Sequence, residues 1–423
     1  MAKKSVTLNQ SWSDALAHPI PFKSIIRVKI FVWLASVSLW AIHSLGSAFY
    51  AFRGDPWSHG DWLISYSQGF VRRGLLGETL FSLSELTSVP VGMLVLTTQI
   101  VAAGFFFVGL AACLSNSELT VSSFALVLIP MSFAYVLVDP ASAGRKEILL
   151  FALAVAWQRV EGKAIAVGFL HFLFGFAAVF LVLSHEGFVF YLPLLILISV
   201  FSNPDLGWFQ ILQRAMILVL PSIVAVLAIS ITDSRATPQG LCEPLLMSGY
   251  AEYTCSGAVH LAAESGLSGI SYGLSWLSNF PPNYFFYIGM GTIYWLLVWA
   301  CFISVISTRQ FAIRRTGVLT LAAGALISTI PIFVIAVDWG RYMQIALLLF
   351  SLALIAPFTR KRTLKSPHPF KSDSRMKAIL LLSVGLFFVS GLAVSDAQYR
   401  SVISTFVNVG YYLNGGLTPE IFD

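Results

Sequence analysis

Four short polar segments interrupt the long apolar runs of this sequence and place basic side chains next to acidic ones. They are Gly60-Asp61-Trp62 with residues 69–74, then residues 139–147, His185-Glu186-Gly187 and residues 338–342. Their basic members are Arg72, Arg73, Arg145, Lys146 and Arg341. Guanidinium groups bind phosphate through paired hydrogen bonds, so phosphate or pyrophosphate is the ligand that these residue types favour. Pairing with Asp, Glu or lipid headgroups is the alternative for any single arginine.

The acidic members of the same segments are candidates for a general base. Asp61 could deprotonate a sugar hydroxyl, or it could simply cap a helix. Glu186 lies between two apolar runs, where a carboxylate is costly unless it is paired, and His185 is the neighbour that could tune it. A hairpin tip that meets water is the alternative for this pair. Asp338 and Arg341 are three residues apart, which is also the spacing of a structural ion pair on a helix.

Cofactor motifs contribute little to the interpretation. Asp55 and His59 lie close to Asp61, which leaves a divalent metal open, but oxygen and nitrogen ligands at this spacing are weak evidence and we assign no metal site. The sequence contains no HExxH, Walker A or dinucleotide fingerprint and no Ser-His-Asp or Cys-His hydrolase motif. Chemistry driven by cytosolic ATP or NAD is therefore not expected.

The composition indicates that membrane-spanning helices position these residues. The 423 residues are 57% hydrophobic and 11% charged, whereas a soluble domain carries about 25% charged residues. We expect one all-α transmembrane domain over residues 1–423, with an uncleaved N-terminal signal anchor and about eleven spans. The spans are placed at 28–50, 91–114, 120–138, 147–158, 164–184, 188–202, 215–232, 284–307, 318–337, 343–358 and 378–396.

The charge distribution predicts the orientation of the spans. With a cytoplasmic N-terminus and an extracytoplasmic C-terminus, eighteen of the 26 Lys and Arg residues fall in cytoplasmic segments, as the positive-inside rule requires. The net charge of +6 is therefore a topology signal, and no nucleic-acid partner is expected. The four polar segments all fall on the extracytoplasmic side, where basic residues are disfavoured unless something else retains them.

Two extracytoplasmic segments are too long to be simple turns. Residues 53–90 contain an expected interfacial helix, on which Leu76, Leu80 and Leu83 share one face that we place toward lipid. Residues 233–283 contain Cys242 and Cys255. These cysteines would form a disulfide if the loop faces an oxidising compartment.

The 69–74 run Gly-Phe-Val-Arg-Arg-Gly, the Asp338-Trp339-Gly340-Arg341 run and the acidic first outer loop resemble bacterial polysaccharide-assembly membrane proteins. These include the GT-C superfamily of polyprenyl-phosphate-dependent glycosyltransferases and the O-antigen and capsule polymerases. The resemblance implies a GT-C-like bundle in the bacterial inner membrane and a sugar donor carried on undecaprenyl phosphate or diphosphate. It also implies that Asp61 is a base or metal ligand and that the arginines contact phosphate. The first loop departs from the family pattern because it lacks a clear Asp-Asp or Asp-Glu pair.

These observations favour an enzyme that transfers or polymerises a lipid-linked glycan onto a glycan acceptor at the outer face. The candidate bases are Asp61, Glu186 and Asp338. A transporter or flippase for a lipid-linked sugar or another anion is the main alternative, although carriers usually place carboxylates near the bilayer midplane. A non-catalytic subunit of an envelope complex is the third. The sugar, its linkage and the oligomeric state stay open.

Overall fold

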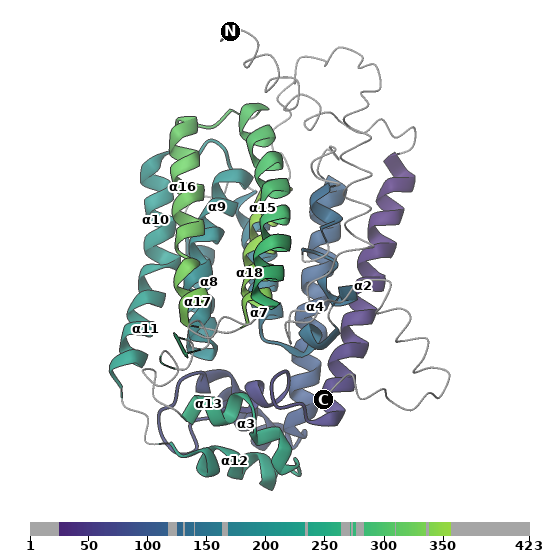
Figure 1. Cartoon of the computed structure of the whole chain (residues 1–423), viewed down its shortest axis with the longest axis vertical. Coiled ribbons are helices and arrows are strands. Elements are labelled where there is room, and N and C mark those ends of the chain that lie inside the picture. The colour runs from purple at the N-terminus through teal and green to yellow at the C-terminus, as the bar shows by residue number, and fades with distance from the viewer. Residues whose placement is uncertain are drawn as a thin grey trace.

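A computed structural model describes residues 25–116, 125–129, 132–138, 140–162, 168–232, 236–263, 271, 274–275, 283–308, 310–335 and 338–356. Throughout these ranges the regular secondary structure is helical, and no strand is present among them. The predicted all-helical fold is therefore confirmed. The helices form an upright bundle, with a layer of shorter helices lying across one of its ends (Figure 1).

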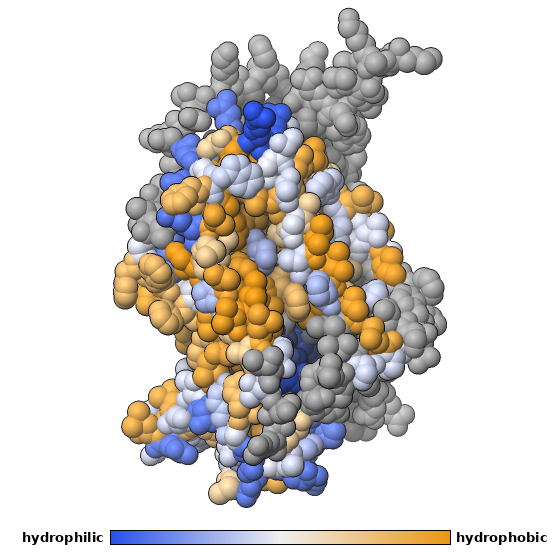
Figure 2. All heavy atoms as spheres, turned by 90° about the vertical axis from the view of Figure 1, so that its left-hand side faces the viewer, coloured by the Kyte–Doolittle hydropathy of each residue, from blue (hydrophilic) through white to orange (hydrophobic). Residues whose placement is uncertain are grey.

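The outer helices of the bundle expose apolar side chains. They are α2 (Ile25–Arg53), α4 (Val91–Asn116), α8 (Phe169–Ser184), α10 (Trp208–Leu218), α11 (Leu220–Ile231), α15 (Asn283–Thr308), α16 (Arg315–Ile327) and α17 (Ile330–Ile335). In the described chain, four helical stretches are long and apolar enough to cross a membrane: Lys29–Arg53, Val91–Asn116, Trp208–Ser230 and Arg315–Val334. Phe176, Phe209 and Leu227 are exposed, and on the face drawn in Figure 2 apolar side chains form a band over the bundle.

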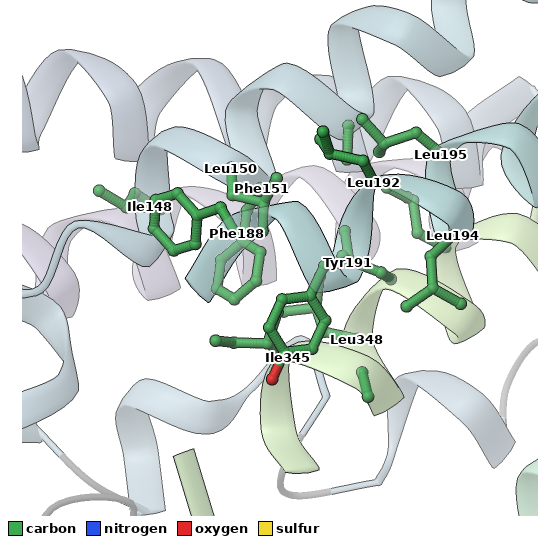
Figure 3. Close-up of a cluster of buried hydrophobic side chains, with 14 of the residues drawn as sticks. Ile148, Leu150, Phe151, Phe188, Tyr191, Leu192, Leu194, Leu195, Ile345 and Leu348 are labelled. Atoms are coloured by element: carbon green, nitrogen blue, oxygen red, sulfur yellow. The ribbon is translucent and has the colours of Figure 1, made fainter. Parts of the chain in front are cut away.

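The inner helices are enclosed by protein. They are α7 (Glu147–Glu161), α9 (Leu192–Ser202) and α18 (Trp339–Leu354), and α18 is buried on all sides from Gly340 to Leu354. A helix that is apolar all round belongs in such an interior. Phe151 of α7, Phe188 and Tyr191 before α9, and Ile345 of α18 pack into one core (Figure 3). This packing fixes the ends of the three inner helices relative to one another.

The layer across the end of the bundle consists of residues 54–90 and 236–263, which we call the end layer. It contains α3 (Gly74–Thr87), α12 (Pro238–Met247), α13 (Ala258–Ala263) and the 3-10 helices η1 (Gly60–Leu63) and η4 (Glu252–Cys255). His59 Nε2 and the Tyr250 hydroxyl lie 2.7 Å apart and join its two segments. A disulfide between Cys242 and Cys255 ties α12 to η4, with the Cα atoms 5.6 Å apart.

The helix predicted in residues 53–90 is present as α3, but the predicted orientation of its leucines is wrong. Leu76 and Leu80 are buried inside the protein, and only Leu83, 40% exposed, lies on the surface. The reason is close packing onto the preceding loop, because a Cβ on Gly77 would overlap the backbone at Ile64. The leucine spacing correctly predicted that Leu76 and Leu80 share one helix face, but this face packs against protein, whereas we predicted that it faces lipid.

Helices occupy the predicted spans wherever the structure describes them, apart from span 120–138. Only part of that span is described, and it contains the short helix α6 (Tyr135–Val138). The span at 378–396 lies outside the described residues. The number of membrane crossings and the GT-C-like arrangement therefore stay predictions.

Candidate functional site

A buried group of charged side chains lies where the inner helices meet the end layer. We call it the polar cluster, and its members come from all four polar segments of the sequence: Asp61, Arg72, Arg73, Arg145, Lys146, Glu147, His185, Glu186, Asp338 and Arg341. Figure 2 shows strongly hydrophilic atoms in the recess between the apolar band and the end layer. Residues far apart in the sequence are thus brought together at one end of the bundle.

Three helices of eight residues or more begin at the polar cluster. The residues at their N-cap positions are Arg73 for α3, Lys146 for α7 and Asp338 for α18, and none of these side chains makes a capping hydrogen bond. The N-terminus of a helix carries partial positive charge on its unsatisfied N–H groups. The backbone therefore adds to the positive potential that the basic side chains create.

A deeply buried ion pair of the cluster, which we call the deep pair, joins Arg341 to Glu147. Arg341 Nε donates to Glu147 Oε1, and the two side chains are only 8% and 6% exposed. Arg341 also lies 3.7 Å from Asp338, the helical pair expected from their spacing, and Arg145 lies 3.5 Å from the same carboxylate. These contacts bind the start of α7 to the start of α18.

Asp61 lies between two cations. Its Oδ1 is 3.6 Å from Lys146 Nζ and 3.8 Å from Arg73 Nη1, while Lys146, which is fully buried, donates to the Ser184 carbonyl at 2.9 Å. Burial acts to raise the pKa of Asp61, but the charges on Lys146 and Arg73 hold it below its ordinary value. Asp61 is therefore an ionised carboxylate at neutral pH.

Arg73 and Glu186 form an ion pair in which both side chains are partly exposed. Arg73 Nε and Nη2 donate to the two Glu186 oxygens in three contacts of 2.9 to 3.1 Å. Arg72 Nη1 lies 3.9 Å from the same carboxylate. Arg73 adopts a left-handed backbone conformation with φ of 67°, which costs about 1 kcal/mol for a residue other than glycine. Strain of this kind often marks a functional position.

His185 is neutral in this environment. Its ring stacks on Phe188 at 4.8 Å, and its Nε2 lies 3.4 Å from Arg341 Nη2. Burial, together with the positive charge of Arg73, lowers the pKa of His185 well below its ordinary value. Because Arg341 can only donate, Nε2 accepts and the proton lies on Nδ1, which is buried and has no hydrogen-bond partner among the described residues.

The structure separates the metal candidates from Asp61. The Asp55 carboxylate accepts from the backbone N–H groups of Trp57 and Ser58 at 3.0 and 2.6 Å, so it closes a local turn. His59 pairs with Tyr250 instead. In the part of the chain that the structure describes, no three His, Cys, Asp or Glu side chains gather in a way that could hold a metal ion.

The polar cluster therefore contains every predicted base and every predicted phosphate-binding residue. Glu147 is the member to which the sequence assigned no role, although it directly follows Lys146. Its burial beside Arg341 depends on how α7 and α18 pack, and sequence spacing carries no signal for that. Asp139, in the same polar segment, lies outside the described residues.

Comparison with known proteins identifies the family to which the chain belongs. Residues 24–262 match the family described as uncharacterised membrane protein Rv1490. The chain belongs to this family. The matched range covers α2 to α13, with Asp61, Lys146 and Glu186, and ends before Asp338 and Arg341. No curated protein and no solved structure matches the chain. The Rv1490-family chain is thus a membrane protein, in agreement with its apolar helices.

Proposed function

We propose that this Rv1490-family protein is a membrane glycosyltransferase or glycan polymerase that uses a sugar carried on polyprenyl phosphate or diphosphate. We place its active side at the extracytoplasmic face of a bacterial inner membrane, where the charge distribution puts the end layer. The observation that carries the proposal is the position of Asp61 between Lys146 and Arg73 in a buried cluster at the end of an apolar bundle. A lipid-linked phosphate needs that combination, because its tail is apolar and its head is anionic.

The chemistry follows from the charges around Asp61. A phosphate held by Arg72 and Arg73 would offset the positive charge beside Asp61, so the pKa of Asp61 would rise toward the range of a working base. Asp61 then takes the proton of an acceptor hydroxyl. The hydroxyl oxygen forms a bond to the anomeric carbon, and the bond from that carbon to the phosphate oxygen breaks. The lipid phosphate leaves with the bonding electrons, and the cations stabilise its charge.

Analysis of lipid-linked precursors tests this proposal in a strain that lacks the protein. We expect wild-type protein to restore the surface glycan, and Asp61→Asn and Arg73→Ala to insert normally yet leave lipid-linked precursor to accumulate. Asp55→Asn is a suitable control, because Asp55 closes a local turn outside the polar cluster. Normal glycan from both Asp61→Asn and Arg73→Ala would contradict the proposal.

A buried ion pair outside the polar cluster favours one alternative, a flippase or other transporter of an anionic lipid-linked sugar. Glu161, at the other end of α7 from Glu147, is fully enclosed and lies 2.7 Å from Arg214 Nε and 3.4 Å from His171 Nε2. Carriers that open one end at a time use such contacts as gates. Purified protein in vesicles discriminates the two, since a flippase moves labelled lipid-linked sugar between leaflets and forms no new glycosidic bond.

A further inference from the structure

Both partners of the contact between Arg73 and Glu186 are partly exposed, whereas each ion pair of the polar cluster that lacks Glu186 has at least one partner that is no more than 8% exposed. The side chains of Arg73 and Glu186 are 21% and 23% exposed, and that of Arg72 is 18% exposed. Arg341 and Glu147 are below 10%, and Lys146 is completely buried. A dissolved or membrane-borne anion can therefore reach Arg72 and Arg73 without separating the deep pair.

Glu186 presents its carboxylate to these arginines as a phosphate group would present two of its oxygens. The three contacts from Arg73 Nε and Nη2 form a paired arrangement, which a guanidinium makes equally with carboxylate and with phosphate. Arg73 is also the N-cap residue of the 14-residue helix α3. The positive end of this helix therefore lies at the base of the side chain that holds the anion.

Rotation of the Glu186 side chain away from Arg73 would change the local charge. Asp61 would then be the carboxylate that remains in ion-pair contact with Arg73 and Lys146, and these three side chains would carry a net charge of +1. Uncompensated positive charge in a partly buried site is unfavourable. A phosphate that arrived as Glu186 left would replace the lost negative charge and would lie beside Asp61.

We propose that Glu186 is a resident counter-ion, and that the phosphate group of an incoming lipid-linked substrate displaces it from Arg72 and Arg73. These two arginines are then the phosphate subsite, and Glu186, one of the candidate bases, acts as its placeholder. This assignment rests on the proposed function only for the nature of the substrate. If the Glu186 carboxylate occupies the subsite for most of the time, phosphate can bind only during the remaining fraction. The apparent affinity for phosphate is then the affinity of the open subsite multiplied by that fraction.

Equilibrium binding of radiolabelled undecaprenyl phosphate to the full-length protein in nanodiscs tests the placeholder. If the carboxylate occupies the arginines about nine-tenths of the time, Glu186→Gln should bind this lipid about tenfold more tightly than wild type. Glu186→Asp should show a smaller gain, because its shorter side chain keeps the charge but reaches Arg73 less well. Glu85→Gln is the matched control and should show no gain, since Glu85 is exposed on α3 and lies outside the polar cluster.

Two further probes, undecaprenol and inorganic phosphate, distinguish recognition of the phosphate headgroup from recognition of the lipid tail. Undecaprenol, which has no phosphate, should show no difference between wild type and Glu186→Gln. Inorganic phosphate that competes with the lipid, more effectively in Glu186→Gln, would support the subsite and show that the headgroup alone is recognised. Equal affinity of all variants for undecaprenyl phosphate, or no binding by any of them, would overturn the placeholder. Because binding needs no turnover, a missing transferase activity alongside the tenfold gain would count against the proposed function alone.

Discussion

The indole N–H of Trp62 donates to the Gly144 carbonyl at 2.7 Å and links two polar segments that are 82 residues apart. Asp61 precedes Trp62, and Arg145 and Lys146 follow Gly144, so this one bond holds the acidic segment against the basic one. The Gln99 side-chain amide donates to the same carbonyl at 2.7 Å. The two donors come from the end layer and from α4, so Gly144 is fixed from both sides.

Replacement of Trp62 by Phe tests this link. The change removes the indole donor and part of a fully buried side chain, whereas Gln99 still satisfies the Gly144 carbonyl. We expect a loss of about 2 kcal/mol in stability, seen as a lower midpoint in thermal unfolding of the purified protein. Trp57→Phe is the control, because Trp57 is 46% exposed and should change stability by no more than about 0.5 kcal/mol. Equal midpoints for the two variants would contradict the link.

The pair between Arg341 and Glu147 should be structural. Glu147→Gln leaves a buried guanidinium with less compensation, so we expect a loss of about 3 kcal/mol or more in stability. The double change of Glu147→Leu with Arg341→Met should recover most of this loss, because it leaves no unpaired charge. Thermal unfolding and membrane abundance measure both effects, with the exposed Glu85→Gln as control. A double variant no more stable than Glu147→Gln would show that the unpaired charge of Arg341 does not cause the loss of stability.

The sequence predicted the helices and placed the polar segments at one end of the bundle. It did not predict which side chains pair with one another within the site. Hydrophobic run length and charge parity place Asp61, Arg73, Lys146 and Glu186 near helix ends, which is information about single segments. Which carboxylate pairs with which cation depends on side-chain packing between helices. Glu147 could not be predicted as a partner of Arg341, because in the sequence it is an ordinary acidic residue in the first turn of a helix. The burial of Leu80 could not be predicted either, since periodicity shows which residues share a helix face but not whether protein or lipid covers that face.

Stability should fall in mild acid because of His59 in the end layer. Burial lowers the pKa of His59 to about 4, although the charge on Asp55 opposes the shift. The unfolded chain binds this proton near pH 6.5, so the unfolded state takes up protons first as the pH falls. The free energy of unfolding should therefore decrease by about 3 kcal/mol between pH 6.5 and 4 from this group alone.

The variant His59→Gln checks that assignment. Glutamine keeps a polar group near the Tyr250 hydroxyl but does not titrate, so the decline of the unfolding midpoint between pH 6.5 and 4 should become shallower than in wild type. Other acid-sensitive groups remain the same in both proteins. Parallel curves for wild type and His59→Gln over this range would show that another group causes the decline.

The disulfide should stabilise the end layer. Cys242 and Cys255 are 13 residues apart, and closing a loop of that size contributes about 3 kcal/mol in the chain-entropy account. The double variant Cys242→Ala with Cys255→Ala should therefore unfold at a lower temperature than the oxidised protein. Reductant should lower the midpoint of wild type and leave that of the double variant unchanged. A reductant effect of equal size in both would assign the loss to another part of the chain.

A structure of the full-length protein in nanodiscs, determined by electron cryomicroscopy with undecaprenyl phosphate present, tests the central claim most directly. The account predicts density for the phosphate within hydrogen-bonding distance of Arg73, next to Lys146 and Asp61, with the Glu186 side chain turned away. Lipid phosphate bound elsewhere, with the contact between Arg73 and Glu186 intact under saturating lipid, would contradict it.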